Sequence, residues 1–301
     1  MNGVENAGRV EDAIASKKRA AADRERALGA DHPETLAARR SLASSYRSAG
    51  RIADSIAIEE PLVADLQRIL GPDHPYTLDT RASLAASYRS AGRTGEAIAI
   101  GEPLVADLER VLGPDRPDTL AARGNLAAAY RLAGRTGEAI TIGEPLVADL
   151  QRSLGPDHPD TLAARSELAA SYRSTGRIDE AIAIEEPLVA DLQRALGPDH
   201  PYALATRASL AASYRSAGRP YEAIAIEERL VADLQRVFGP GHPNTLTARA
   251  SLAASYRSAG RTGEATAIEE PLVAELRRAL GPKAPPFPDR PGNGNEESPR
   301  D

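Results

Sequence analysis

The histidines of this sequence are the first residues to consider for chemistry, because clustered histidines can bind a metal ion. The histidines each precede a proline and recur as His32, His74, His158, His200 and His242, with Arg116 in the one remaining slot. If each repeating unit is a pair of helices, equivalent residues are separated by two helix layers of about 8–10 Å each. Zinc ligands lie about 2 Å from their ion. The histidines therefore cannot share one metal ion, and we interpret them as residues at the starts of helices.

The residues that other catalytic mechanisms need are missing or repeated. Cysteine is absent, which excludes a thiol nucleophile, a disulfide and a zinc–cysteine site. The dipeptide Gly-Lys never occurs, which excludes a phosphate-binding loop with its lysine. The recurring Gly-Arg-Thr-Gly-Glu segments at 92–96, 134–138 and 260–264 lie between predicted helices, so we interpret them as turns. Because every candidate residue occurs in several copies, we expect no enzyme activity, no cofactor and no metal.

Arginine forms two series in which the residue returns every 42 positions. The first series is Arg39, Arg81, Arg123, Arg165, Arg207 and Arg249. The second series is Arg47, Arg89, Arg131, Arg173, Arg215 and Arg257. The first series falls near an apolar stripe, so we expect its stems to pack. Some of its guanidinium groups are expected to meet a glutamate of the same unit, namely Glu59, Glu185, Glu227 or Glu269.

The elements that carry these residues repeat every 42 residues without an insertion. Within residues 76–113, apolar residues return at steps of three and four from Leu78 to Tyr88 and again from Ala97 onward, which is the period of an amphipathic helix. Gly92 ends the first helix, and a Gly-Pro pair ends the second. Each unit is therefore predicted to be a helix hairpin in which the recurring tyrosine packs. Such hairpins must stack to bury their apolar stripes.

The repeats predict an all-α solenoid over residues 9–281, made of six full hairpins after one leading helix. The hairpins begin near Pro33, Pro75, Pro117, Pro159, Pro201 and Pro243. Residues 1–8 are expected to form a flexible N-terminus. Residues 282–301 are rich in proline and glycine, a composition typical of a disordered tail.

The leading helix, over residues 9–30, aligns with the second helix of each hairpin but is more polar. It carries Ser16 and Arg24 where the first hairpin has Ile58 and Leu66. Solenoids need polar outer faces at their ends to stay soluble. We therefore predict that this helix is an N-terminal cap, with a gene truncated in mid-repeat as the alternative.

Composition limits the classes of partner. The net charge is −6 with acidic and basic residues interspersed, which gives no electrostatic argument for DNA or RNA. No apolar run approaches the roughly 20 residues of a membrane span. We expect a soluble, cytoplasmic protein, and the strong preference for arginine over lysine indicates a bacterial source.

Leu84, Ala85, Tyr88, Gly92 and Ala97 have the spacing of the tetratricopeptide repeat. The 42-residue period and its Leu-Gly-Pro-Asp-His-Pro junction resemble the longer variant found in kinesin light chain and its bacterial relatives. The resemblance covers roughly residues 9–281. It implies a right-handed α–α superhelix whose first helices line a concave groove that binds proteins or peptides.

The second helices depart from this family in two ways. The large residue usual at mid-helix is replaced by Glu59, Gly101, Gly143, Glu185, Glu227 or Glu269. Two residues later stands Pro61, Pro103, Pro145, Pro187 or Pro271. An interior proline removes a hydrogen bond and costs about 3 kcal/mol in a regular helix. We therefore predict that these helices kink at the prolines or break and restart there.

The second arginine series lies at the position that faces the groove in the resembled family. Ser83, Asn125, Ser209 and Ser251 are the candidate groove residues beside it. The six predicted first helices contain thirteen arginines against five acidic residues, so this side is basic and the remainder acidic. Since arginine captures carboxylates through two hydrogen bonds, we expect an extended, acidic segment as ligand. The alternative is a solvated basic face without a particular ligand.

These observations predict a scaffold or adaptor that binds a protein or peptide in the groove. Two alternatives belong to other classes. One is a detached sensor or regulatory arm of a signalling NTPase system. The other is self-association of the array end to end, through the last helix with its Leu272, Val273 and Leu276.

Overall fold

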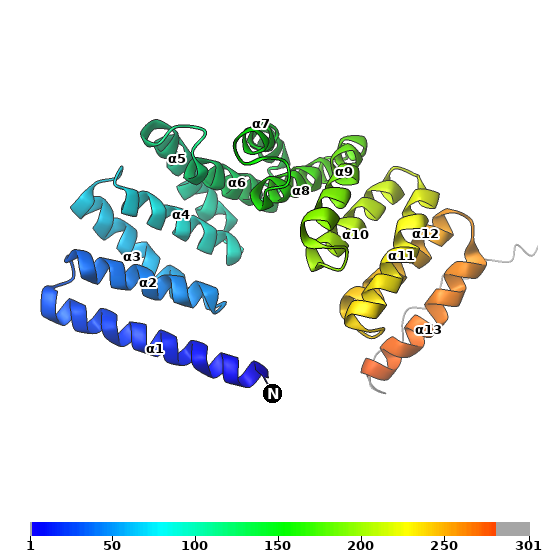
Figure 1. Cartoon of the computed structure of the whole chain (residues 1–301), viewed down its shortest axis with the longest axis horizontal. Helices are drawn as coiled ribbons and strands as arrows, with labels where there is room; N and C mark the ends of the chain where they lie inside the picture. The colour runs from blue at the N-terminus through cyan, green and yellow to red at the C-terminus, as the bar shows by residue number, and fades with distance from the viewer. Residues whose placement is uncertain (1, 281–301) are drawn as a thin grey trace, which may run out of the picture. The chain divides into compact units, whose positions relative to one another are not determined.

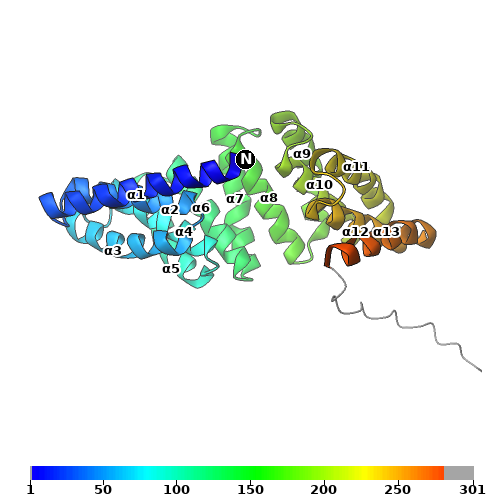
Figure 2. The same ribbon diagram turned by 90° about the horizontal axis from the view of Figure 1, so that it is seen from below.

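The computed structural model describes residues 2–280, and all the regular structure within that range is α-helix. The chain divides into two compact units, Met1–Gly197 and Pro198–Asp301. Each unit is described by itself. Figures 1 and 2 show consecutive helices of each unit lying side by side in antiparallel pairs. The expected all-α fold of packed helix hairpins is confirmed.

The first unit consists of a leading helix and four hairpins, coloured blue to green in Figure 1. Its helices are α1 (Asn2–Leu28), α2 (Pro33–Ser48), α3 (Ile52–Leu70), α4 (Pro75–Ser90), α5 (Thr94–Val111), α6 (Pro117–Leu132), α7 (Thr136–Leu154), α8 (Pro159–Ser174) and α9 (Ile178–Leu196). Hairpins 1 to 4 are α2–α3, α4–α5, α6–α7 and α8–α9. The first helices α4, α6 and α8 also contact one another in order, and together they form what we call the first-helix face of this unit.

The second unit contains the last two hairpins. Its helices are α10 (Pro201–Ser216), α11 (Pro220–Phe238), α12 (Pro243–Ser258) and α13 (Thr262–Leu280). Hairpin 5 is α10–α11 and hairpin 6 is α12–α13, and α10 contacts α12 directly. No described helix of either unit is long and apolar enough to cross a membrane.

Local sequence signals set the ends of the helices. Pro75 occupies the first turn of α4, where its missing N–H removes no hydrogen bond. The imidazole Nδ1 of His74 accepts a hydrogen bond from the backbone N–H of Tyr76 at 3.2 Å and so caps the same helix. Gly92 follows α4 with a φ of 74°, a left-handed conformation that glycine adopts without strain. Each of the helices α2, α4, α6, α8, α10 and α12 begins at one of the prolines near which the sequence analysis starts a hairpin.

The leading helix begins earlier than the sequence predicts. α1 starts at Asn2 instead of residue 9, so residues 2–8, expected to be a flexible N-terminus, belong to the helix. Its buried residue Ile14 packs against Leu42 and Tyr46 of α2. Ser16 and Arg24 are exposed, as expected for the outer face of a cap. The predicted tail, residues 282–301, lies outside the described residues.

The prediction that second helices break at their interior prolines is wrong. α3, α5, α7, α9 and α13 are each one uninterrupted helix with proline inside. In α3, Pro61 and Ala57, whose carbonyl loses its partner, are both exposed, so water can replace the lost hydrogen bond. Leu62 and Leu66 bury the opposite side of the helix. Burying each such leucine contributes about 1.5–3 kcal/mol, which offsets the proline.

The core of the first unit is a series of contacts between consecutive hairpins. Ile56 of α3 packs with Leu84 and Tyr88 of α4 in a cluster that continues to Leu126 and Tyr130 of α6. These tyrosines are buried, as the sequence predicts. Each hairpin thus covers the apolar stripe of its neighbour, which is why a single hairpin could not fold alone.

Candidate functional site

The candidate site is a hollow of ≈ 320 Å³ between α6, α7 and α8, which we call the central hollow. It exists because the facing positions carry small side chains. On α6 these are Ala121, Gly124 and Ala128, and on α8 they are Ala163 and Ala164. Adjacent helices keep a nearly constant separation, so short side chains on both leave unfilled space between them.

The floor of the central hollow is apolar. It is formed by Leu120, Leu146, Leu150 and Leu168, all of which are buried from solvent. Polar groups stand among the other lining residues, including Arg89 and Asn125. A concave site with apolar walls and a few polar groups is the usual form of a ligand site. This hollow can hold one apolar side chain of a ligand with a polar group beside it.

Two smaller hollows of the same kind occur, one in each unit. One of ≈ 270 Å³ lies between α2, α3 and α4 and is lined by Leu36, Leu66 and Tyr76 among others. The other, also ≈ 270 Å³, lies between α10, α11 and α12 and includes Ser251 in its lining. Each of these three hollows forms where a first helix, its partner helix and the next first helix meet, whereas the corresponding space between α4, α5 and α6 is only ≈ 10 Å³. The central hollow is the one with an arginine of the second series in its lining.

Most of the second arginine series is neutralised inside the protein instead of being presented to a ligand. Arg47 Nη1 donates to Glu59 Oε1 at 3.2 Å in hairpin 1. The same pair recurs as Arg173–Glu185 at 3.1 Å, Arg215–Glu227 at 3.0 Å and Arg257–Glu269. These glutamates are the residues expected to meet the first arginine series. That expectation is wrong, because the second series holds them.

The glutamate of this pair is a buried carboxylate. Glu59 is only 2% exposed, and burial raises its pKa, while Ser87 and Arg47 act in the opposite direction. Burial likewise raises the pKa of Glu227. A buried carboxylate is costly unless it is paired with a cation. The hydrogen-bonded arginine is the partner that makes this burial tolerable.

Hairpins 2 and 3 lack this glutamate, because Gly101 and Gly143 occupy its position. In hairpin 3, Arg131 Nε donates instead to Glu167 of α8 at 2.8 Å. The corresponding residue for Arg89 is Asn125, which carries no charge. Within residues 8–275, whose side chains are described, Arg89 has no ion-pair partner, and its buried Nε has no hydrogen bond.

The sequence-predicted groove residues are therefore only partly brought together. Arg89 and Asn125 both line the central hollow, whereas Ser251 lines the hollow of the second unit. Ser83 offers its backbone oxygen to Arg47 Nη1 at 3.5 Å. Ser209 is half-buried and lines none of the three hollows. The expectation of a row of free arginines is corrected: within the described side chains, Arg89 is the one member of the second series without an ion pair.

The first arginine series pairs with an acidic residue 26 positions later, on the second helix of the same hairpin. In hairpin 2, Arg81 is 6% exposed and donates to Asp107 Oδ2 at 2.7 Å. Hydrogen bonds from Arg81 and from Arg110 hold the pKa of Asp107 below its usual value. The other pairs are Arg39–Asp65, Arg123–Asp149, Arg165–Asp191, Arg207–Asp233 and Arg249–Glu275. This series joins the two helices of each hairpin.

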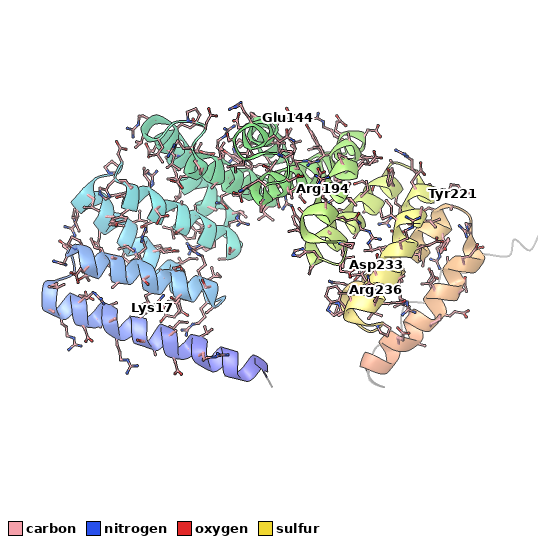
Figure 3. The ribbon with its side chains drawn as sticks, in the orientation of Figure 1. Lys17, Glu144, Arg194, Tyr221, Asp233 and Arg236 are labelled. Atoms are coloured by element: carbon pink, nitrogen blue, oxygen red, sulfur yellow. The ribbon has the colours of Figure 1, made fainter. Side chains whose placement is uncertain are left out.

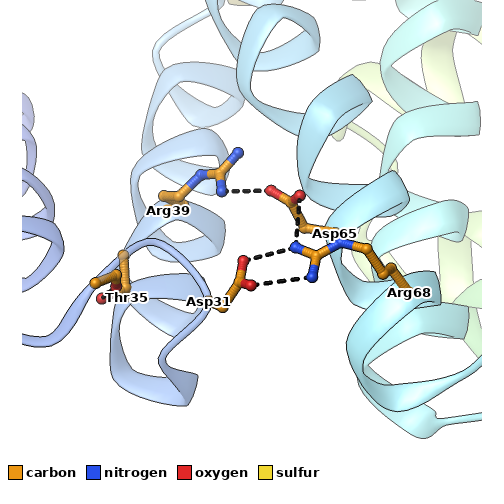
Figure 4. A network of polar contacts seen from close by, with 6 residues as sticks. Asp31, Thr35, Arg39, Asp65 and Arg68 are labelled. Atoms are coloured by element: carbon orange, nitrogen blue, oxygen red, sulfur yellow. Dashed lines mark hydrogen bonds and ion pairs between the residues drawn. The ribbon is translucent and has the colours of Figure 1, made fainter.

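A third arginine series, which the sequence analysis missed, holds the loop before hairpins 1 to 5, as Figure 4 shows for hairpin 1. Arg68 of α3 binds both carboxylate oxygens of Asp31, at 2.6 and 3.0 Å, and also reaches Asp65 at 3.4 Å. The hydroxyl of Thr35 donates to the Gly29 carbonyl of the same loop at 2.8 Å. The equivalent pairs are Arg110–Asp73, Arg152–Asp115, Arg194–Asp157 and Arg236–Asp199. Figure 3 shows Asp233 and Arg236, which are also hydrogen-bonded, together on α11.

The tyrosines join consecutive hairpins through a repeated polar contact. The hydroxyl of Tyr88 on α4 donates to Glu60 Oε1 on α3 at 2.6 Å. The guanidinium group of Arg93 lies 4.4 Å from the centre of the Tyr88 ring, a cation–π distance. Burial and the Glu60 carboxylate raise the pKa of Tyr88 to about 12. The sequence predicted the packing of this ring but not its hydroxyl partner.

The histidines cap helices. Each accepts a hydrogen bond through Nδ1 from the backbone N–H two residues later, at 3.2 Å in all five cases. Arg116, in the equivalent slot, makes no such bond. The predicted role at helix starts is confirmed. Nowhere among the described residues do three histidine or acidic side chains gather as metal ligands would.

Comparison with known proteins gives a family for these repeats. A tetratricopeptide repeat model matches residues 5–34, 35–76, 77–118, 119–160 and 161–202. A second tetratricopeptide repeat model matches residues 208–270. No curated protein matches the sequence.

Solved structures show the same repeat fold. One, described as a putative kinesin light chain from Podosopora anserina with nearly identical TPR-like repeats, is 32% identical, with a TM-score of 0.63 over 68% of this chain and 98% of that chain. BtubC (BKLC) from P. vanneervenii is 18% identical, with a TM-score of 0.63 over 82% of this chain and 99% of that chain. A signal transduction ATPase with a tetratricopeptide repeat sensor, from Pyrococcus horikoshii, is 13% identical, with a TM-score of 0.62 over 91% of this chain and 45% of that chain.

Proposed function

Because this chain belongs to the tetratricopeptide repeat family, whose fold generally mediates protein–protein interaction, we propose that it is a scaffold or adaptor. Its ligand is an extended segment of a partner protein that lies along the first-helix face of the first unit. One apolar side chain of that segment enters the central hollow. Cytoplasmic location, expected from the sequence, is part of this proposal.

The central hollow is the observation that carries the proposal. It combines an apolar floor, small-residue walls and an unpaired arginine at one lining position. Its volume of ≈ 320 Å³ falls in the range of about 300–1,000 Å³ that is typical of ligand sites. Well-packed interiors leave few voids larger than a water molecule. A partner side chain that filled this space would therefore gain contacts that the free protein lacks.

A pair of matched substitutions tests this role. Ala121 is exposed on α6 and lines the hollow, so Ala121→Phe should fill the space without disturbing the buried core. Ala148 is exposed on α7 and lines none of the three hollows, so Ala148→Phe is the control. Binding of peptides selected from a random library on the full chain should be lost in the first variant and kept in the second. Equal binding by both would remove the central hollow from the binding site.

Self-association end to end, the alternative of another class, is opposed by the last helix. In hairpin 5, Ile224 packs on Leu252 and Tyr256 of the next first helix. The equivalent residue of α13 is Thr266, whose hydroxyl bonds to the carbonyl of Thr262 in its own helix at 3.0 Å. A polar residue at the stacking position weakens any contact with a further hairpin. The sensor-arm alternative is supported only by a likeness of fold, so we do not propose it.

A further inference from the structure

We infer that Arg89 and Asn125 form a subsite for a single carboxylate at the edge of the central hollow. The occupant is the side chain of a glutamate in the extended partner segment. This inference rests on the proposed function and names the chemistry of the ligand at the same site.

The other arginines of the second series each hold a glutamate of the chain itself. In four hairpins the glutamate comes from the second helix of the same hairpin, twelve positions later, as in Arg47–Glu59. In hairpin 3 it comes from the next first helix, as Glu167. The chain therefore provides five examples of a glutamate side chain bound at this position. The structure shows two different directions from which such a carboxylate can arrive.

Hairpin 2 has the arginine but neither source of carboxylate. Gly101 stands where the first source would be, and Asn125 stands where the second would be. The Nε of Arg89 is shielded from solvent yet has no hydrogen bond among the described residues. The guanidinium group of Arg89 is therefore left without the carboxylate that its equivalents hold, and a ligand carboxylate can supply it.

The surroundings allow a carboxylate to approach. Two acidic residues line the central hollow. Glu167 is paired with Arg131, and the Asp160 carboxylate is 71% exposed beside His158. The amide of Asn125 can donate a hydrogen bond to the second carboxylate oxygen, while arginine supplies a charge-assisted one. Of the second series, Arg89 is the member that lines this hollow, so an acidic residue and an apolar residue of one ligand can be held together.

Two substitutions should close the subsite with carboxylates that the chain already uses elsewhere. Gly101→Glu copies the arrangement of hairpin 1, and Asn125→Glu copies that of Arg131 with Glu167. A Cβ at position 101 would lie 3.1 Å from Leu126 Cδ1, the mobile end of a side chain, so a small shift accommodates it. The neutral control for bulk is Gly101→Gln. The control for added charge is Ala148→Glu, at the exposed position of α7 that lines none of the three hollows.

The probe is a library of random dodecapeptides fused to the C-terminus of a carrier protein and selected on the full wild-type chain. The best binder is then synthesised with its selected sequence. Variant peptides are made in which each glutamate in turn is changed to glutamine, and one further peptide has the selected sequence with an amidated C-terminus. Affinities are measured by calorimetry for wild type and the four variants, each checked by thermal unfolding. We expect one glutamate whose change weakens binding about tenfold or more, the size typical of a charge-assisted hydrogen bond.

The selected peptide is expected to lose the same affinity on Gly101→Glu and Asn125→Glu, whereas Gly101→Gln and Ala148→Glu should bind it about as well as wild type. If the peptide binds wild type and all four variants with equal affinity, the carboxylate subsite is wrong, while the proposed function stands. Dependence on the amidated C-terminus instead of a glutamate would overturn the assignment to a side chain. Selection of no binder at all would contradict the proposed function, and this inference with it.

Discussion

Hairpins 1 and 2 are built from nearly the same residues, yet they differ in what they leave open. Both carry a first-series arginine bound to an aspartate, through Arg39 and Arg81. Both also carry a second-series arginine at the same position. In hairpin 1 that arginine binds the buried Glu59, whereas in hairpin 2 Gly101 leaves Arg89 without a partner. The glutamate position thus separates a hairpin whose second-series arginine is paired within the hairpin from one whose arginine is not.

This comparison shows how a repeat protein can place a site without changing its fold. The contacts that stack the hairpins, such as the tyrosine hydroxyl on the preceding helix, recur in both units. They fix the helix arrangement regardless of what stands at the glutamate position. A substitution there changes the available charge on the first-helix face while the stacking contacts remain. The predictions below test the shared contacts and the difference separately.

The largest effect should come from the shared stacking contacts. Tyr130 is 7% exposed and packs with Leu126 and residues of neighbouring helices. Tyr130→Ala should lower the free energy of unfolding by about 3–5 kcal/mol, the usual cost of truncating a buried aromatic residue. Urea denaturation followed by circular dichroism measures this.

The matched control keeps the ring and removes only the hydroxyl, which donates to Glu102. Tyr130→Phe should cost about 0.5–1.5 kcal/mol, the net value of one hydrogen bond. Equal losses for the two variants would mean that the polar contact, and not ring packing, holds the hairpins together.

A reciprocal exchange sharpens the difference between hairpins 1 and 2. Glu59→Gly places in hairpin 1 the glycine that hairpin 2 has as Gly101, and it leaves Arg47 without its ion-pair partner. The selected acidic peptide should then bind at a second place, and its calorimetric stoichiometry should rise from one towards two per chain. Glycine inside α3 should also cost about 1 kcal/mol of stability. An unchanged stoichiometry with a folded variant would show that an unpaired arginine is not sufficient for binding.

The tyrosine contacts of hairpins 2, 3 and 4 predict a pH dependence of stability. The pKa values of Tyr88, Tyr130 and Tyr172 are raised to about 12, first by burial and then by the neighbouring glutamate. A raised pKa favours the protonated phenol in the folded state. This contribution to stability is fully present below the ordinary value of 10.0 and is lost as the pH rises to about 12.

Spectrophotometric titration at 295 nm measures this directly. At pH 11 the folded chain should show less phenolate absorbance than the chain unfolded in guanidinium chloride, because these three rings remain protonated. Coincident titration curves for folded and unfolded protein would contradict the tyrosine contacts.

The smallest effect concerns the helix caps, for which hairpins 3 and 4 provide the comparison. His158 caps α8 through Nδ1, whereas Arg116 does not cap α6. His158→Arg should lower the free energy of unfolding by about 0.5–1 kcal/mol, and Arg116→His should raise it by a similar amount. Opposite shifts in thermal midpoint would support the cap. A shift of the same sign in both variants would contradict it.

The sequence was sufficient to predict the hairpins, because their signals are local. Proline at the first turn, glycine after the last and apolar residues at steps of three and four each act within one helix. The repeat period also indicates the proline at which each first helix begins. The length of α1 was missed, since residues 2–8 carry no apolar stripe that could reveal a helix.

The ion pairs were harder to predict, because partners come from different helices. Both arginine series lie on the first helix of a hairpin, and sequence alone could not tell which one reaches Glu59. A usable signal was present: hairpin 3 lacks the glutamate and is followed by Glu167, whereas hairpin 2 lacks it and is followed by Asn125. Side-chain geometry was needed to show that these positions share one arginine. The continuity of the proline-containing helices likewise depended on packing that no local signal reports.

The most direct test of the central claim is a double-mutant cycle between Arg89 and the ligand glutamate. Affinities are measured for wild type and Arg89→Gln, each with the selected peptide and with its glutamate-to-glutamine form. If Arg89 binds that glutamate, the two changes should be coupled by at least about 1 kcal/mol, within the range found for residues in contact. Purely additive losses would contradict the account, because they would show that the arginine and the glutamate do not meet.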